Sequence, residues 1–159
     1  MPSGKIHSIA NIAVAVSGST TMFLLQMGTE GIAGVAIGAM TGILCGPDQD
    51  VDGGNISDYI IRRYIGVALE MAWDCAWMPY RKICRHRGIL SHAPIISTVL
   101  RVLYLSALYF IVATPLKLVI NIVHIDWPLL WWWAFVGLVL ADASHYGLDK
   151  LDEAMGGRL

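Results

Sequence analysis

The stretch IAGVAIGAMTGILC-GPDQD, residues 32–50, decides the fold that this sequence predicts. Residues 32–45 carry no charge, and Gly34, Gly38 and Gly42 recur at every fourth position. On a helix this spacing makes one stripe of small residues, through which membrane helices approach each other closely. The pair Gly46-Pro47 then ends the helix. The stretch therefore predicts a membrane helix that packs through its glycines against the helix before it.

Three further apolar stretches accompany this one. We expect four membrane spans, since about 20 apolar residues cross a bilayer. They are residues 6–27, 32–45, 94–114 and 129–147. The composition agrees, because 56% of the 159 residues are hydrophobic and 14% are charged, against about 25% charged in soluble domains. We therefore predict an all-α fold, one domain over residues 1–159, built as a four-helix up-down bundle integral to the membrane.

The first span has an alternative interpretation as a signal peptide cleaved near Ala15-Val16-Ser17. The apolar run before that site is short and contains Asn11, which favours a membrane span. Turns are expected at residues 28–31 and 126–128, and 116–125 continues the third span as a bent extension.

Residues 48–92 form a polar helical insert between the second and third spans. Within it, 64–78 is expected to be one amphipathic helix near the membrane surface. Trp73, Trp77 and Tyr80 are expected at the membrane interface, where such side chains are enriched.

The few charges gather at one face of the predicted bundle. In an up-down topology, this face holds the start of the first and third spans and the end of the second and fourth. Lys5, Lys150, Arg158 and the basic residues of the insert lie there, whereas Lys117 lies opposite and Arg101 lies within a span. Because cytoplasmic loops are rich in Lys and Arg, we expect this face to be cytoplasmic in a multi-pass inner-membrane protein. Three cysteines without CxxC spacing agree weakly with a reducing compartment.

Most of the five histidines lie at the same face, together with aspartates. Singly, each has a plainer explanation, such as an interfacial histidine, a turn aspartate or a basic headgroup-binding patch. Jointly they predict a metal site, because imidazole nitrogens and carboxylate oxygens bind zinc, manganese and iron. His124 falls near the opposite face and is interpreted as interfacial. The expected ligands are His7, Asp48, Asp50, His86, His92, His145 and Asp149.

These ligands exceed the needs of one four-coordinate ion, so one or two divalent ions are expected, zinc foremost and manganese or iron as alternatives. Two ions sharing a carboxylate or a water can attack phosphate esters. We therefore predict a membrane-embedded metal-dependent hydrolase acting on a phosphoester or lipid-linked substrate at the cytoplasmic face. Asp52 and Asp142 are candidate catalytic residues, as a general base or as partners that orient a ligand. Arg85 and Arg87 are candidates for binding a substrate phosphate.

The order of the motifs resembles that of a family of bacterial inner-membrane metal-dependent hydrolases. In that family an N-terminal His, a Pro-Asp-x-Asp turn, a His-Arg-Gly segment with a second His, and a late His-x-x-x-Asp pair occur in this order. The matching positions here are His7, Pro47-Asp48-Gln49-Asp50, His86-Arg87-Gly88 with His92, and His145 with Asp149.

A related family of metal-binding membrane proteins found in cyanobacteria is more similar, and the resemblance covers most of the chain. It rests on residues 1–4 with His7, on 77–82 and on 85–94. The spacing from His86 to His92, one residue longer than is usual in the hydrolase family, also favours it. This resemblance implies the metal more than the reaction. A more distant likeness to zinc-dependent phospholipase C and its nuclease relatives suggests phosphodiesters by fold-level analogy.

Two other functions fit the same sequence. In one, the metal is structural, all its positions are filled by protein, and the protein is not an enzyme. In the other, the chain is an assembly subunit that uses the glycine stripe and Trp131-Trp132-Trp133 as contacts. The expected partners are the lipid bilayer, a lipid or phosphoester substrate and a second copy in a homo-oligomer. Nucleic acid is not expected, because the net charge is -1.

Overall fold

The computed structural model describes residues 4–51, 54–84, 88–116 and 127–157. The regular structure within these ranges is helical, which confirms the all-α prediction. In chain order the elements are α1 (Gly4–Leu24), α2 (Gly28–Cys45), the 3-10 helix η1 (Pro47–Asp50), α3 (Ile56–Tyr64), α4 (Val67–Ile83), α5 (Ile89–His92), α6 (Pro94–Leu116) and α7 (Trp127–Ala154). The predicted site residues Asp52, Arg85, His86 and Arg87 lie outside the described residues, as do His124 and the expected extension over 117–125.

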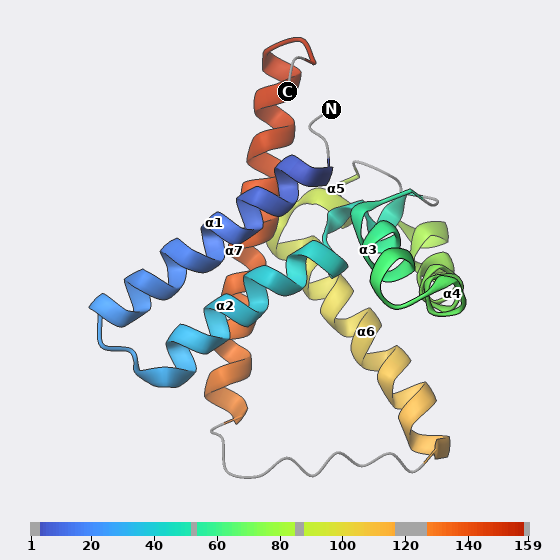
Figure 1. Ribbon diagram of the computed structural model, residues 1–159, viewed down its shortest axis with the longest axis horizontal. Helices are drawn as coiled ribbons and strands as arrows, with labels where there is room; N and C mark the ends of the chain where they lie inside the picture. The colour runs from blue at the N-terminus through green and yellow to red at the C-terminus, as the bar shows by residue number, and fades with distance from the viewer. Residues whose placement is uncertain (1–3, 52–53, 85–87, 117–126, 158–159) are drawn as a thin grey trace.

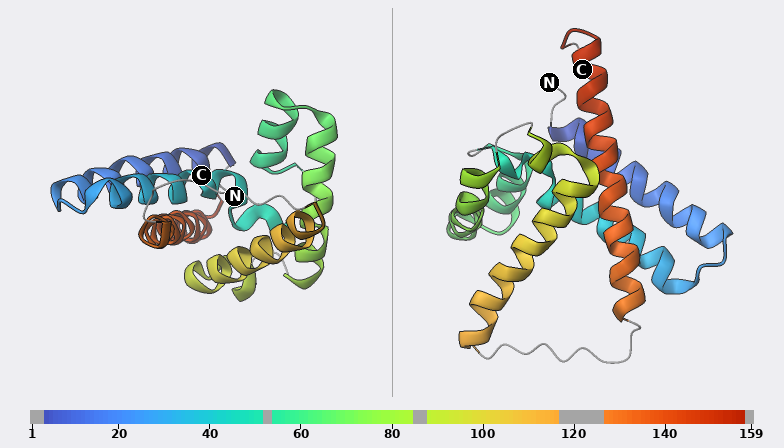
Figure 2. Two further views of the ribbon diagram at one scale, coloured as in Figure 1. Left: turned by 90° about the horizontal axis from the view of Figure 1, so that it is seen from below. Right: turned by 180° about the vertical axis from the view of Figure 1, so that it is seen from behind.

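The helices α1 and α2 form an antiparallel hairpin, and α7 crosses it (Figures 1 and 2). The turn lies at residues 25–27, ahead of the expected 28–31, because α2 already begins at Gly28. The first residue of α1 and the last residue of α7 lie at the same end of the molecule (Figure 1). This end also carries η1 and α5.

Gly34 and Gly38 of the α2 stripe pack against α7, and Gly42 lies between Asn11 of α1 and Ala141 of α7, so the predicted packing against the first helix is correct only in part. A Cβ atom on Gly38 would lie 2.7 Å from the carbonyl carbon of Ala134 and 2.8 Å from the backbone nitrogen of Leu138. A Cβ atom on Gly34 would lie 2.5 Å from the Cβ atom of Trp133. These glycines let the α2 backbone contact that of α7. On a different side of α2, the side chain of Val35 packs against Gly18 of α1.

The insert holds two helices, α3 and α4, and the amphipathic helix expected over 64–78 corresponds to α4, which begins three residues later and continues to Ile83. The two helices are separated at Gly66, whose φ of +130° is accessible to glycine because glycine has no Cβ atom. Trp77 and Tyr80, expected at the membrane interface, are 0% and 1% exposed. They pack in a core cluster with Cys45 and Cys84, so for these two residues the interfacial prediction is wrong.

The helix α6 begins at Pro94, as predicted, and diverges from α7 towards its far end (Figures 1 and 2). In the described part of the chain, two segments are long and apolar enough to cross a membrane: Gly28–Asp50 and Pro94–Val112. They overlap the predicted spans 32–45 and 94–114. The four-span topology stays a prediction.

Candidate metal centre

Backbone breaks place the candidate ligands at one end of the helices. Gly46 and Pro47 end α2, and η1 then places Asp48 beside His145 of α7 and Asp50 beside His92 of α5. Pro94 begins α6 and leaves His92 as the last residue of the short helix α5. His145 and Asp149, one turn apart on α7, complete the group together with His7 of α1.

One triad consists of His7, His145 and Asp149, and all three side chains are buried. The Oδ1 atom of Asp149 lies 3.4 Å from Nε2 of His7, and its Oδ2 atom lies 3.4 Å from Nε2 of His145. The two imidazole rings stack with centroids 3.7 Å apart and planes 14° from parallel. A single carboxylate thus faces two imidazoles from two different helices.

A second triad consists of Asp48, His92 and His145, and the ligand atoms within each triad lie within 4.8 Å of one another. The Nε2 atom of His145 lies 3.4 Å from Oδ1 of Asp48, and Nε2 of His92 lies 3.7 Å from Oδ2 of Asp149. Nε2 of His145 therefore faces Asp48 and Asp149 at once. His145 belongs to both triads, so the two groups of candidate ligands adjoin each other.

The spacing of these atoms fits a bound ion better than direct hydrogen bonds. Separations of 3.4 Å between nitrogen and oxygen exceed the usual hydrogen-bond range of about 2.7–3.2 Å. Two ligand atoms at the usual zinc distances, on adjacent corners of a tetrahedron, lie about 3.4 Å apart. Several buried atoms also have no hydrogen-bond partner among the described residues: both ring nitrogens of His7, Oδ1 of Asp48, Nε2 of His145 and both carboxylate oxygens of Asp149. Buried polar atoms are rarely left so, and the residues present therefore fit a divalent ion.

Asp50 and Ser91 contact the other nitrogen of His92. Nδ1 of His92 lies 3.0 Å from Oγ of Ser91 and 3.6 Å from Oδ2 of Asp50. Such a partner on the far nitrogen orients a ligating imidazole and increases its basicity. Asp50, predicted as a ligand, is thus placed where it can orient His92. Ser91 is not among the residues that the sequence motifs indicate as site residues.

The surroundings of two of these groups shift their pKa values. Burial raises the pKa of the Asp149 carboxyl, but the imidazoles of His145 and His7 outweigh it and hold that pKa well below its usual range. Burial lowers the pKa of the His92 imidazole, although Asp50 opposes the shift. The ionised carboxylate and the neutral imidazole are the forms that ligate metals.

Asp142, predicted as a catalytic residue, lies one helical turn before His145 but engages another partner. It forms a buried ion pair with Arg101 of α6 and accepts a hydrogen bond from the hydroxyl of Thr98. Arg101 also donates to the carbonyl oxygen of Cys45 at the end of α2. This contact links α2, α6 and α7 and gives Arg101, a charge within a predicted span, its partner.

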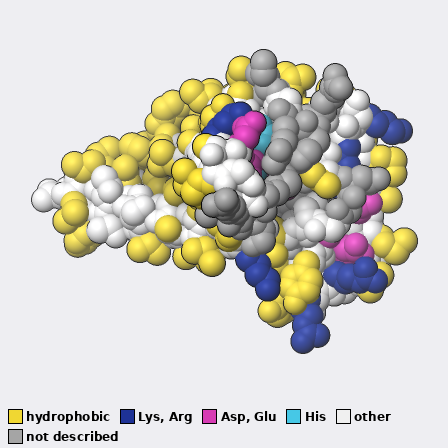
Figure 3. Space-filling model, turned by 90° about the horizontal axis from the view of Figure 1, so that it is seen from above, with side chains coloured by type: hydrophobic (Ala, Val, Ile, Leu, Met, Phe, Trp, Pro, Cys, Tyr) yellow, Lys and Arg dark blue, Asp and Glu magenta, His cyan; other side chains and the backbone are white. Residues whose placement is uncertain are grey.

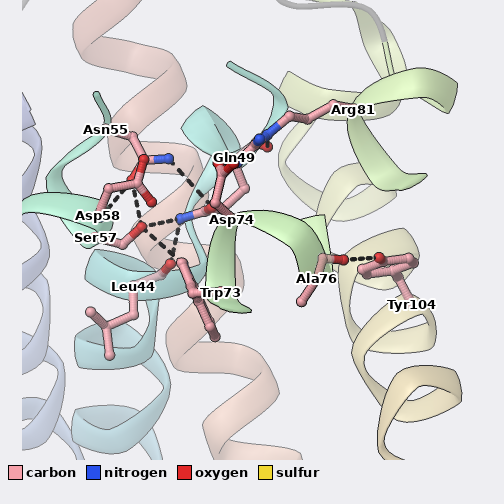
Figure 4. A network of polar contacts seen from close by, with 10 residues as sticks. All are labelled: Leu44, Gln49, Asn55, Ser57, Asp58, Trp73, Asp74, Ala76, Arg81 and Tyr104. Atoms are coloured by element: carbon pink, nitrogen blue, oxygen red, sulfur yellow. Dashed lines mark hydrogen bonds and ion pairs between the residues drawn. The ribbon is translucent and has the colours of Figure 1, made fainter. Parts of the chain in front are cut away.

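A hydrogen-bond network holds η1 against α3 and α4 (Figure 4). The Nε2 atom of Gln49 donates to the carbonyl oxygen of Leu44 at 2.6 Å and to Oγ of Ser57 at 2.5 Å. Arg81 donates to the carbonyl oxygen of Gln49 at 3.2 Å and forms a 2.6 Å ion pair with Asp74. These bonds fix the backbone on both sides of Asp48 and Asp50.

A cavity opens beside the centre, and His7, Asp48 and His145 form part of its wall. It encloses about 290 Å³, its open mouth included. Figure 3, seen from above, shows histidine beside acidic side chains on this face of the molecule. The other wall residues are Ser8, Asn11, Gly42, Ile43, Gly46, Gln49, Asn55 and Ile56.

Comparison with known proteins supports metal binding. No curated protein and no solved structure matches the chain. A family model described as "uncharacterized metal-binding protein (DUF2227)" matches residues 2–158. The match covers all the His and Asp side chains of both triads, and the protein belongs to this family of metal-binding proteins.

Proposed function

We propose that this protein binds one divalent metal ion through His7, Asp48, His92, His145 and Asp149, and that the ion holds its helices together. The observation that carries the proposal is the convergence of these side chains from α1, η1, α5 and α7. Zinc is the foremost candidate, and manganese and iron also suit a set of nitrogen and oxygen donors without thiolate.

The packing of the hairpin against α7 supports a role in stability. The buried cluster there consists of Ala15, Ala39 and Ala141, with Val14 packed against it. Small side chains bury little apolar area and so contribute little free energy. The binding energy of a metal adds directly to the free energy of folding when the unfolded chain lacks the site.

The test is metal content and thermal unfolding of the protein purified in detergent. We expect about one equivalent of a divalent metal per chain by elemental analysis. We also expect EDTA to lower the unfolding temperature and zinc to restore it. A protein that carries no metal, and whose unfolding temperature does not respond to EDTA or zinc, would refute the proposal.

We further propose that α6 crosses the membrane with α2, and that α1 and α7 complete a four-helix bundle. Large apolar side chains of α6 are exposed, among them Ile95 at 63%, Phe110 at 63% and Ile111 at 69%. A soluble monomer rarely leaves so extended an apolar surface in water, whereas lipid covers it without cost. The metal centre would then lie at the cytoplasmic end of the bundle, where the predicted insert carries its basic residues.

Cysteine labelling tests this topology. Cys75 on α4 is exposed, whereas Cys45 and Cys84 are buried. A membrane-impermeant maleimide should label Cys75 in lysed cells and leave it unlabelled in intact spheroplasts, with Cys75→Ser as the control. Labelling in intact spheroplasts would place the insert outside, and recovery of the chain in the soluble fraction would refute the membrane bundle.

Metal-dependent hydrolysis is the second candidate function, and the cavity favours it. Structural sites are closed, whereas catalytic sites keep a position open, and three of the candidate ligands line a cavity here. A bound divalent ion would supply Lewis-acid polarisation and would lower the pKa of water. Asp142, paired with Arg101, would position His145 from one turn away, and Arg85 and Arg87 would bind the phosphate of a phosphoester or lipid-linked substrate.

Assays of phosphodiester and phospholipid hydrolysis, with and without chelator, test this second candidate. We expect turnover that EDTA abolishes and that zinc or manganese restores. An Arg85→Gln and Arg87→Gln double variant should raise KM more than it lowers kcat. Full metal loading without turnover on these substrates would leave the metal-binding protein as the function and would reject the hydrolase.

A further inference from the structure

The helix α4 exposes apolar side chains and keeps most of its charges on its less exposed side. Of its four charged residues, only Lys82 is exposed, whereas Asp74 and Arg81 pair with each other. Large apolar side chains occupy exposed positions along the helix: Val67, Leu69, Met71, Met78 and Ile83. A helix that faces water shows the reverse pattern, with its charged face outward. The exposed face of α4 is therefore suited to apolar surroundings.

The junction between α3 and α4 is apolar as well, and two arginines precede it. Tyr64 is 79% exposed and Ile65 is 63% exposed. Arg62 and Arg63, in the last turn of α3, are also exposed. Such a combination is typical of segments that lie on a membrane, because the apolar groups enter the boundary of the acyl chains while the cations meet the headgroups.

The orientation of α4 agrees with a position along the membrane surface. Figure 1 shows α4 end-on beside α6, and the left view of Figure 2 shows α4 along its length, so α4 crosses α6. Tyr104 of α6 holds this crossing, since it donates a hydrogen bond to the carbonyl oxygen of Ala76 and packs against Trp77. Its neighbour Leu103 is 62% exposed. A helix that crosses a membrane span lies close to the plane of the bilayer, so the apolar face of α4 adjoins that of α6.

Charge selects the occupant of this surface. Among residues 54–84, the exposed charged side chains are all basic, whereas the acidic side chains are buried or partly buried. The basic ones are Arg62, Arg63 and Lys82. A two-fold contact with a second copy through this surface would bring the same cations together. An anionic leaflet instead offers both the apolar layer and the negative charge.

We propose that α4 and the α3–α4 junction lie in the headgroup region of the cytoplasmic leaflet, and that Arg62 and Arg63 bind anionic phospholipid there. The inference rests on the proposed membrane bundle and adds the class of lipid that it recognises. The guanidinium groups donate hydrogen bonds to lipid phosphates, and Tyr64 and Ile65 enter the acyl boundary. Cys75 of α4 stays in the hydrated headgroup region, within reach of a polar maleimide.

The experiment measures how closely lipids approach the junction. Ile65→Cys is labelled with bimane in a Cys75→Ser background, in which the remaining cysteines are buried. The full-length protein is placed in lipid nanodiscs that contain nitroxide-labelled phospholipid, which quenches bimane on contact. We expect strong quenching at residue 65. Phe110→Cys on the proposed span α6 is the positive control. Glu153→Cys is the negative control, because its side chain is 68% exposed in the last turn of α7.

The charge of the quenching lipid tests the role of the arginines. In phosphatidylcholine nanodiscs, nitroxide-labelled phosphatidylglycerol should quench residue 65 about twofold to fivefold more than nitroxide-labelled phosphatidylcholine. One basic residue at an anionic surface contributes about 1 kcal/mol, which equals about fivefold. Arg62→Gln combined with Arg63→Gln should abolish this preference and leave the quenching by phosphatidylcholine. Lys150→Gln is the matched control, because Lys150 pairs with Glu153 on α7, and it should keep the preference.

The possible failures are distinguishable. Quenching at Phe110→Cys together with no more quenching at Ile65→Cys than at Glu153→Cys would refute the surface position of α4 and leave the membrane bundle intact. This result is expected if a second copy covers the junction. Equal quenching by the two lipids, or a preference that survives the double arginine variant, would refute the binding of anionic lipid. Absence of quenching at Phe110→Cys would refute the membrane bundle and this inference with it.

Discussion

Arg101 of α6 and Asp142 of α7 form an ion pair in the interior of the molecule, and each side chain is only 1% exposed. Burial raises the cost of leaving either charge alone. The pair lies one helical turn before His145, so it fixes α7 against α6 next to the metal centre. Its energetic coupling can therefore be read in both stability and metal binding.

Replacing one member of this pair should be far worse than replacing both. Arg101→Met or Asp142→Leu alone should lower the free energy of unfolding by about 3–5 kcal/mol, because an uncompensated charge remains buried. The double variant should recover most of this loss, since two apolar side chains pack without a charge. Reversible unfolding in detergent measures the double-mutant cycle. Losses that simply add in the double variant would show that the two residues are not coupled.

Asp149 faces both His7 and His145, so its replacement should lower metal affinity more than that of any other carboxylate of the centre. Asp149→Asn removes the charge with little change in shape and should reduce metal affinity by at least ~10-fold, judged by the effect of disturbing the groups around a metal. Glu153→Gln, one turn further along α7, is the control, because Glu153 forms an exposed pair with Lys150. Competition with a zinc chelator measures both. Equal affinity of Asp149→Asn and Glu153→Gln would contradict the assignment of Asp149.

Gly38 should be intolerant of even a methyl group. Its Cβ atom would meet the α7 backbone at the Ala134 carbonyl, and overpacking of this kind costs about 1–3 kcal/mol. Separation of α2 from α7 should also move Asp48 away from His145 and weaken metal binding. Gly147→Ala is the matched control, because no described atom lies within 4 Å of its Cβ position; it should be stabilising by about 0.5–1 kcal/mol through helix propensity. Thermal unfolding and metal content distinguish the two variants.

The Asp58 carboxyl should destabilise the protein at neutral pH. Burial and, after it, the nearby Asp74 carboxylate raise the pKa of Asp58 above its ordinary value of 3.8. The folded state therefore binds more protons than the unfolded state between these two pKa values, and stability falls as the pH rises through that window. Asp58→Asn should raise the unfolding temperature at pH 7 and change it less at pH 4. The helix cap stays, since Asn55 binds the backbone N–H of residue 58. A larger gain at pH 4 than at pH 7 would contradict the sign of this shift.

Local sequence signals predict much of the secondary structure. Gly46 and Pro47 end α2, and Pro94 begins α6, because the proline ring fixes φ and removes a backbone donor. The helix α7 runs to Ala154, beyond the end of the predicted span at 147, since its last turns are polar and lack the apolar signal of a span. Such turns continue the helix as long as the backbone bonds are made.

Side-chain type alone predicts less about packing partners. The glycine stripe indicates a close approach, but a Cβ-free surface is the same whether α1 or α7 covers it, and at Gly34 and Gly38 it is α7 that does. Trp77 and Tyr80 have the composition of an interfacial belt and yet lie in the core with Cys45. An aromatic residue with a polar end suits both environments, and the sequence lacks the information that separates them.

For the metal site too, the sequence predicts one part and the tertiary structure decides the rest. The sequence suffices to predict that the ligands converge, because ligand chemistry and helix length are local properties. The prediction needs only the composition, an up-down order of helices, and the positions of the ligands at helix ends: His7, Asp48, His92, His145 and Asp149. The individual contacts depend instead on the rotation of each helix about its axis. They are the two carboxylates of Asp48 and Asp149 that face Nε2 of His145, the contact of Asp50 with the far nitrogen of His92, the ion pair of Arg101 with Asp142 and the buried amide of Asn11. Contacts between distant segments set those rotations, chiefly the glycine surface of α2 against α7, and they appear once the chain is folded.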